Sequence, residues 1–109
     1  MTNKELPVLD KVLSFKPKEL IRIIRTAASK KKWAILDLKI EEGLNRLHVC
    51  CSDEEPAFCI TIIPEEPRRL AGPFKMPRTR LTVYSLKARE DEIDELDKVL
   101  HMAFFRGGG

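Results

Sequence analysis

The chain has 109 residues, of which 43% are hydrophobic and 34% charged, with a net charge of +3. This length allows one domain with one small core, and the composition excludes collagen, coiled-coil fibres and wholesale disorder. No apolar run approaches the roughly 18 residues that span a bilayer, and residues 1–7 lack the apolar core of a secretory signal. We therefore expect one domain over residues 1–109, in the cytoplasm, with no membrane partner.

Residues 1–15 contain a short apolar pattern that predicts a docked N-terminal arm, either extended or a helical turn. A helix is expected next, because Pro17 suits a first helical position and Glu19 a first turn. Its apolar residues recur at helical spacing from Leu20 to Ala28, which is typical of a helix facing a core. Its other side carries a basic stripe of Lys18, Arg22 and Arg25.

The remaining chain predicts four strands, a long loop and a second helix. Alternation of apolar and polar residues predicts strands over residues 33–40, 45–51, 57–63 and 80–86. Pro64 is expected to end the third of these strands, and residues 64–78 to form a basic, proline-rich flap. A helix is predicted over residues 90–106, followed by a glycine tail at residues 107–109. The fold class is therefore α+β: a four-stranded antiparallel sheet in the order α-β-β-β-β-α, with helices on one face and an exposed, partly aromatic opposite face.

A continuous apolar face selects the register of the first two hairpins. It pairs Leu38 with Leu47 in the first hairpin, and Val49 with Ile60 in the second. The outer face of the sheet then carries aromatic, aliphatic and basic side chains together. These residues are Trp33, Ile35, Asp37, Lys39, Arg46, His48, Cys50, Cys59, Thr61, Ile63, Arg80, Thr82 and Tyr84.

Charge is distributed in blocks. Residues 16–32 hold seven basic side chains and one acid, and residues 68–89 hold seven basic side chains and no acid. Residues 53–66 hold five acids and residues 90–97 hold six, both without a base. Such a polarised surface attracts polyanions, although the same charges can also serve only to keep the protein soluble. Two asparagines and no glutamine, with frequent Lys, Arg and Glu, indicate a hyperthermophile bias.

The cysteines and histidines do not indicate a metal or catalytic site. The chain has three cysteines but no C-x-x-C pair, and strand alternation places Cys50 and Cys51 on opposite faces. The predicted register sets Cys50 opposite Cys59, so a disulfide between them is conceivable. Asp37 and His48 read as a structural pair, because no nucleophile follows at a recognisable spacing. We expect no metal, no cofactor and no enzymatic activity.

Two segments point to partners. The flap interleaves cations with an aromatic ring, which suits a stiffened arm that grips a nucleic-acid strand, or a plain surface connection. Its candidate contacts are Arg68, Arg69, Phe74, Lys75 and Arg78. The apolar stripe of the last helix fits either the core or a homodimer seam. The stripe consists of Ile93, Leu96, Leu100, Phe104 and Phe105, and the last two cannot both face one core, so one of them should meet a partner subunit or the N-terminal arm.

The order of a helix, four antiparallel strands and an acidic then apolar helix, with Lys31-Lys32-Trp33 opening the first strand, resembles the archaeal ThermoDBP group. The resemblance covers residues 15–106 at the level of architecture. It implies binding of single-stranded nucleic acid and dimerisation through the C-terminal helix.

The predicted function is binding of single-stranded DNA or RNA with little sequence specificity. Bases would stack on Trp33, Tyr84 and Phe74, since aromatic side chains on a basic surface are typical of such proteins. Phosphates would contact the basic groups of the sheet and the flap. The expected site comprises Trp33, Ile35, Lys39, Arg46, His48, Arg68, Arg69, Phe74, Lys75, Arg78, Arg80 and Tyr84. The alternative is a protein-interaction module that docks a partner on an exposed patch of Trp33, Ile35, Ile63 and Tyr84.

Overall fold

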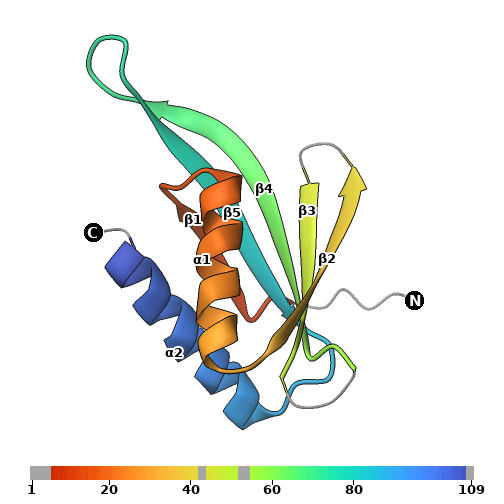
Figure 1. Cartoon of the computed structure of the whole chain (residues 1–109). Helices are drawn as coiled ribbons and strands as arrows, with labels where there is room; N and C mark the ends of the chain where they lie inside the picture. The colour runs from red at the N-terminus through yellow and green to blue at the C-terminus, as the bar shows by residue number, and fades with distance from the viewer. Residues whose placement is uncertain (1–5, 42–43, 52–54, 108–109) are drawn as a thin grey trace.

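The computed structural model describes residues 6–41, 44–51 and 55–107, and only the backbone of residues 37–41 and 105–107. The described residues form five strands and two helices with an α+β architecture (Figure 1). The elements are β1 (Leu9–Leu13), α1 (Pro17–Lys30), β2 (Ala34–Glu41), β3 (Leu44–Cys50), β4 (Phe58–Arg69), β5 (Lys75–Ser85) and α2 (Glu90–Gly107). Neither described helix is long and apolar enough to cross a membrane.

The sheet is antiparallel throughout and has the strand order β1-β5-β4-β3-β2. The prediction of four strands is therefore wrong, because the N-terminal arm supplies a fifth. Leu9 pairs with Val83 and Leu13 with Thr79, which makes β1 an edge strand beside β5. Both leucines are half-buried against the core, so pairing satisfies the backbone of the arm while its apolar side chains are covered.

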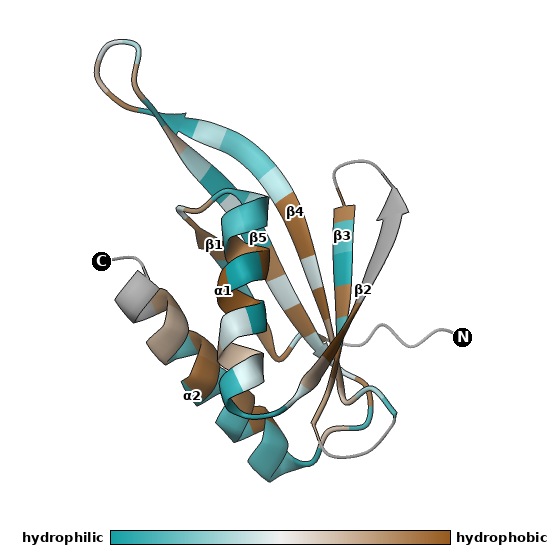
Figure 2. Ribbon diagram, viewed as in Figure 1, coloured by the Kyte–Doolittle hydropathy of each residue, from teal (hydrophilic) through white to brown (hydrophobic). Residues whose placement is uncertain are grey.

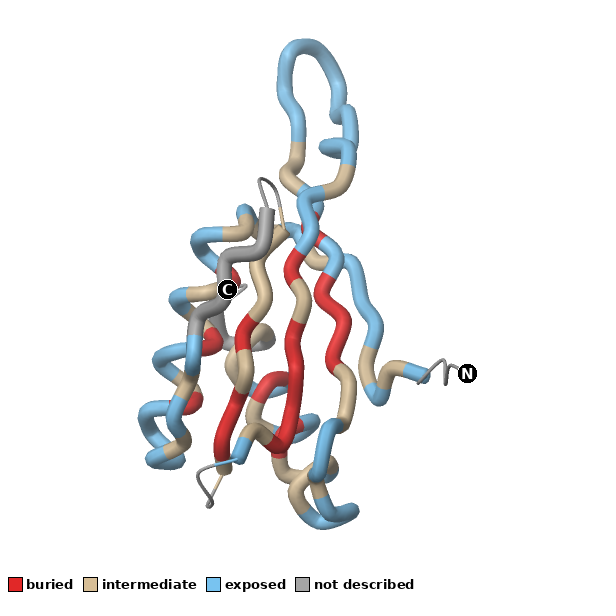
Figure 3. The backbone as a smooth tube through the Cα atoms, turned by 90° about the vertical axis from the view of Figure 1, so that its right-hand side faces the viewer, coloured by how far each residue is buried: buried red, intermediate tan, exposed pale blue. Residues whose placement is uncertain are grey.

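The core lies between the two helices and one face of the sheet, which we name the covered face (Figure 1). Leu20 and Ile24 of α1 and Leu96 and Leu100 of α2 are buried there. The sheet contributes Leu47, Val49, Phe58, Ile60, Ile62, Leu81 and Val83 to the same cluster. Buried residues concentrate in the middle of the central strands (Figure 3), and hydrophobic residues concentrate in the same stretches (Figure 2).

Helix α1 begins and ends close to the predicted residues. Pro17 occupies the first turn, and the Lys16 backbone N–H donates to Glu19 Oε1 at 3.0 Å, which caps the helix. After α1 the chain turns through Lys32, which has a φ of +62°. The Trp33 N–H then donates to the Ala28 carbonyl at 2.9 Å, so the start of β2 is tied to the last turn of α1.

The first hairpin differs from the predicted register by one residue. Ile35 pairs with Val49 and Leu36 with His48. A shift of one residue exchanges the two faces of a strand, because side chains alternate. Trp33 and Ile35 consequently pack against the core on the helix side, whereas Leu36 is 49% exposed on the other face. The predicted outward position of Trp33 and Ile35 is therefore wrong.

The second hairpin differs from the predicted register by two residues, so its faces are as predicted. Leu47 pairs with Ile60, and both are fully buried. Cys59 lies opposite His48 rather than Cys50, which removes the geometry on which a Cys50 to Cys59 disulfide depended. The cysteines at positions 50, 51 and 59 are not joined by disulfides. Burial raises the pKa of the Cys51 thiol to about 11.

The predicted flap over residues 64–78 is wrong. Strands β4 and β5 continue through these residues as a two-stranded extension, which we name the ribbon, and it extends well beyond the rest of the sheet (Figure 1). Pro64 pairs with Thr79 and does not end β4. After Ile62 in β4 and before Thr79 in β5, no described residue of a third strand pairs with either strand, and proline is tolerated on such an edge because no further ladder bond is lost. A register shift between Glu65 and Arg68 marks a bulge.

Candidate functional site

The sheet face opposite the helices, which we name the open face, is the first candidate. Both helices pack on the covered face, so none of the described elements lies over the open face (Figure 1). Strand alternation and pairing assign its members, because directly paired residues share a face. The described side chains of this face are Val8, Asp10, Val12, Ala34, Leu36, Arg46, His48, Cys50, Cys59, Thr61, Ile63, Arg80, Thr82 and Tyr84.

Arg46 lies near the middle of the open face, opposite Thr61 of β4. Its side chain is half-buried, and its Nε is buried without a hydrogen-bond partner among the described residues. A buried donor without a partner costs about 1–3 kcal/mol, so a rotation of this side chain that brings Nε to an acceptor such as a phosphate oxygen recovers that cost. Among the described residues of the predicted site, Arg46 is the one with a buried hydrogen-bond donor that lacks a partner.

Arg80 is already paired. Its Nε donates to Asp10 Oδ1 at 3.0 Å and its Nη2 to Asp10 Oδ2 at 2.7 Å, across β1 and β5. The hydrogen bonds from Arg80 lower the pKa of the Asp10 carboxyl, and the same bonds raise the pKa of Arg80. Sequence reasoning missed Asp10, because residues 8–13 show no clean alternation and the arm was not expected to be a strand.

One row of side chains crosses the open face from strand to strand. Leu36 lies beside His48, His48 beside Cys59, and Cys59 beside Tyr84. His48 and Tyr84 are half-buried, with a small thiol between them. Two rings on an otherwise uncovered surface can stack bases, which is the role that the sequence assigned to this face.

The ribbon continues the open face with further cations. By alternation Arg78 lies on the same side as Arg80, and Arg68 is paired with Met76 on that side as well. Arg69 and Lys75 are paired with each other on the opposite side. Phe74 lies at the turn and is 69% exposed; there the Leu70 N–H donates to the Phe74 carbonyl at 2.9 Å. The predicted flap residues are thus divided between the two sides of a hairpin.

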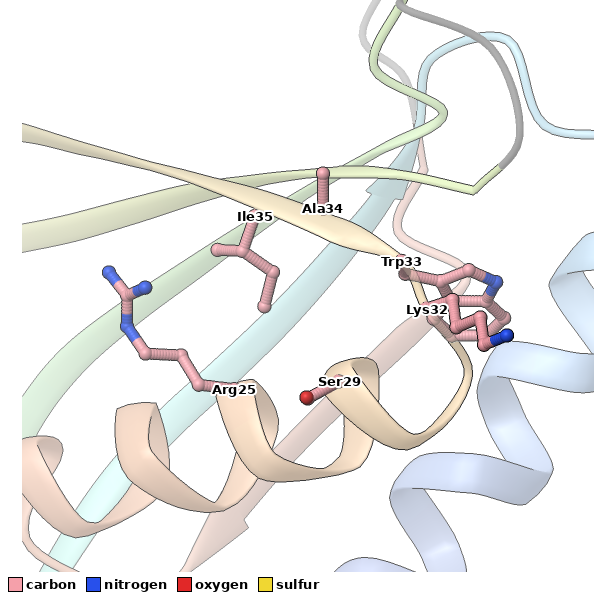
Figure 4. Close-up of a pocket in the computed structure, with 6 residues that line it drawn as sticks. All are labelled: Arg25, Ser29, Lys32, Trp33, Ala34 and Ile35. Carbon is pink, nitrogen blue, oxygen red and sulfur yellow. The ribbon is translucent and has the colours of Figure 1, made fainter.

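Trp33 and Ile35 lie on the covered side of the sheet and not on the open face. They line a pocket of about 300 Å³ at the junction of α1 and β2, together with Arg25, Ser29, Lys32 and Ala34 (Figure 4). They are therefore separated from Ile63 and Tyr84 by the sheet itself. The predicted protein-docking patch of Trp33, Ile35, Ile63 and Tyr84 does not exist as one surface. Lys39 was also assigned to the site, but its side chain is outside the described residues.

The apolar stripe of α2 is used within the chain. Leu96 is 4% exposed and Leu100 2% exposed in the core, and Ile93 packs against it. The ring of Phe104 meets that of Phe15 in the N-terminal arm, with centroids 6.2 Å apart. This confirms that one of the two adjacent phenylalanines contacts the arm; the Phe105 side chain is outside the described residues. A homodimer through this helix stays a prediction.

Within the described chain, no three histidine, cysteine or acidic side chains converge as metal ligands would. No protein-family model matches the chain, and no curated protein matches it. The resemblance to the ThermoDBP group therefore stays a prediction from architecture. The functional argument depends on the geometry of the open face and the ribbon.

Proposed function

We propose that the protein binds single-stranded DNA or RNA across the open face and along the ribbon, with little sequence specificity. The observation that carries the proposal is the shared side of Arg46, Arg78, Arg68 and the Tyr84 ring on a face that no described element covers. Stacking surfaces beside a line of cations are what an extended strand of nucleic acid requires.

Each part of the surface has a distinct role. Tyr84 and His48 offer rings for stacking on the sheet, and Phe74 offers one at the end of the ribbon. Arg46, Arg78 and Arg68 contact phosphates, whereas Arg80 contributes less because Asp10 already neutralises it. Stacking and phosphate contacts do not depend on base identity, so the expected sequence preference is weak. Trp33, which faces the helices, has no part in this proposal.

The proposal is tested by titrating the chain with fluorescently labelled oligothymidylate and oligouridylate at low and high salt. The logarithm of the binding constant should fall with the logarithm of salt concentration, at about −0.7 per neutralised phosphate. Arg78→Ala should flatten this slope by less than one unit. Phe74→Ala should weaken binding by about 1–3 kcal/mol and leave the slope unchanged.

Met102→Ala is the matched control for Phe74→Ala. Met102 is 59% exposed on α2, on the helix side of the molecule, so its loss removes exposed apolar area without touching the open face. Binding by the Met102→Ala variant should equal that of the wild type. The proposal fails if no oligonucleotide binds at low salt. It also fails if neutralising Lys18 and Arg22 abolishes binding while Arg78→Ala and Phe74→Ala leave it unchanged.

A further inference from the structure

Strand β2 forms one edge of the sheet, and half of it lacks the features that normally protect an edge. It is hydrogen-bonded to β3 on one side, and no described strand pairs with its other side. Residues 37–41 include Asp37, Lys39 and a register shift before Glu41, all of which discourage pairing with another chain. Residues 34–36 are Ala-Ile-Leu, with no charge, proline or bulge. This segment therefore offers unpaired backbone groups at an accessible edge.

The pocket lined by Trp33 and Ile35 lies directly beside this unprotected segment. Figure 4 shows Ala34 and Ile35 on β2, with Ser29 and Arg25 on α1 across from them and Lys32 at the turn. Figure 4 places the Arg25 guanidinium at one end of this lining and the Lys32 and Trp33 side chains at the other, with the Ser29 hydroxyl and the Ile35 side chain between them. Such a lining suits a carboxylate on a short apolar stem.

The backbone conformation of Lys32 positions this residue in the pocket lining. Its φ of +62° is in the left-handed region, which a lysine adopts at some cost. The hydrogen bond from the Lys32 N–H to the Ser29 carbonyl, at 3.0 Å, and that from Trp33 to Ala28 hold this turn against the helix end. Lys32 thereby lies in the pocket lining next to β2.

We propose that the edge of β2 at residues 34–36 binds an extended acidic peptide by strand addition, with one carboxylate of the peptide in this pocket. Strand addition requires a peptide, because a nucleic acid has no backbone amides and carbonyls with which to continue the hydrogen-bond ladder. The proposal does not depend on the function proposed for the open face, because the pocket that holds the carboxylate lies on the covered side of the sheet.

Strand geometry defines the sequence that the site selects. Successive residues of an added strand point to opposite faces of the sheet, so one residue enters the pocket and its two neighbours point to the open face. There one neighbour meets Leu36, which is 49% exposed, and the other meets Ala34. The preferred peptide therefore has an acidic residue between two apolar residues. Leu36 and the pocket contact adjacent side chains of the peptide and so determine which sequence binds. Hydrogen bonds between the peptide backbone and β2 supply the rest of the affinity.

The probe is a fluorescein-labelled peptide of sequence Ser-Thr-Val-Glu-Val-Thr-Ser, measured by anisotropy with the full chain. The same peptide with Gln in place of Glu should bind about two- to fivefold more weakly, the range of a surface ion pair. Two further peptides carry N-methyl groups on alternate amides, in the two possible sets. Strand addition predicts that one set abolishes binding and the other leaves it intact, because alternate amides face the protein.

Lys32→Gly is the test variant on the protein. Glycine accepts the positive φ, so this change removes the ammonium group without straining the turn. Binding of the Glu peptide should fall two- to fivefold, and that of the Gln peptide should not change. Lys11→Ala is the matched control, since Lys11 is an exposed lysine on β1 at the opposite edge of the sheet.

Three results would overturn the proposal: equal effects of the two N-methyl sets, equal binding of the Glu and Gln peptides, or sedimentation as a dimer that Leu36→Lys dissociates. The last result would mean that a second copy of the chain covers the edge. Oligonucleotide titration of the Lys32→Gly variant keeps the two proposals separate. If oligonucleotides bind and the peptide does not, the edge-strand proposal fails while the proposed nucleic-acid function stands.

Discussion

The two faces of the sheet achieve burial in different ways. On the covered face, Phe58 and Leu47 are fully buried by the helices. On the open face, Cys59 and Thr82 are 8% and 6% exposed although no described helix lies above them. Cys59 lies between two larger neighbours on the adjacent strands, His48 and Tyr84, and Thr82 pairs with Asp10 of β1, to which its hydroxyl donates.

Because of this difference, we expect the covered face to determine stability and the open face to determine binding. Helices over an apolar face exclude water and leave few polar groups to satisfy. On the open face, large side chains of neighbouring strands cover polar atoms and leave some of them without a hydrogen-bond partner. The Nε of Arg46 is an example. We therefore expect substitutions on the covered face to change the free energy of unfolding most, and those on the open face to change mainly binding.

The largest expected effect contrasts two consecutive residues. Phe58→Ala removes a fully buried ring from the covered face and should lower the free energy of unfolding by about 3–5 kcal/mol. Cys59→Ala, on the open face, should lower it by about 1 kcal/mol or less. Urea denaturation of both variants measures the difference. Equal losses would show that the open face carries as much of the stability as the core.

A smaller effect contrasts two buried threonines of β5. The Thr79 hydroxyl is fully buried and donates to the Phe15 carbonyl at 2.5 Å. Thr79→Val keeps the shape but leaves that carbonyl without its donor, so the free energy of unfolding should fall by about 1–3 kcal/mol. Thr82→Val removes a longer bond of 3.4 Å to Asp10 and should cost about 0.5 kcal/mol. Denaturation curves with the reverse ranking would contradict the comparison.

The smallest effect is the pH dependence of the open face. Hydrogen bonds from Arg80 lower the pKa of Asp10 in the folded chain, so the stabilisation is present at neutral pH. It is lost as the pH falls below about 4, the ordinary range of an aspartate, toward the lowered pKa. Asp10→Asn should therefore have a slightly lower Tm at neutral pH and a shallower decline in acid. Parallel acid limbs for the two proteins would show that the pair contributes nothing.

Local sequence patterns were sufficient for the helices and for the faces of the central strands. Leu20, Ile24 and Ala28 recur at helical spacing, and these three are the buried residues of α1. Leu47, Val49 and Ile60 are each apolar between more polar neighbours, and an error of two residues in their register did not change their face. The acidic start of α2 and the basic block of the ribbon were also visible in the sequence.

Tertiary structure decided the rest, for reasons that alternation cannot supply. In β2 both possible faces are apolar over residues 33–36, so only packing under α1 and the bond from Trp33 to Ala28 select the covered face for Trp33 and Ile35. Residues 9–13 become a strand because β5 has a free edge for them. A proline interrupts a strand in the interior of a sheet but not a strand of a two-stranded ribbon. The sequence does not show which of these two settings residues 64–77 occupy, and only the topology places them in the ribbon.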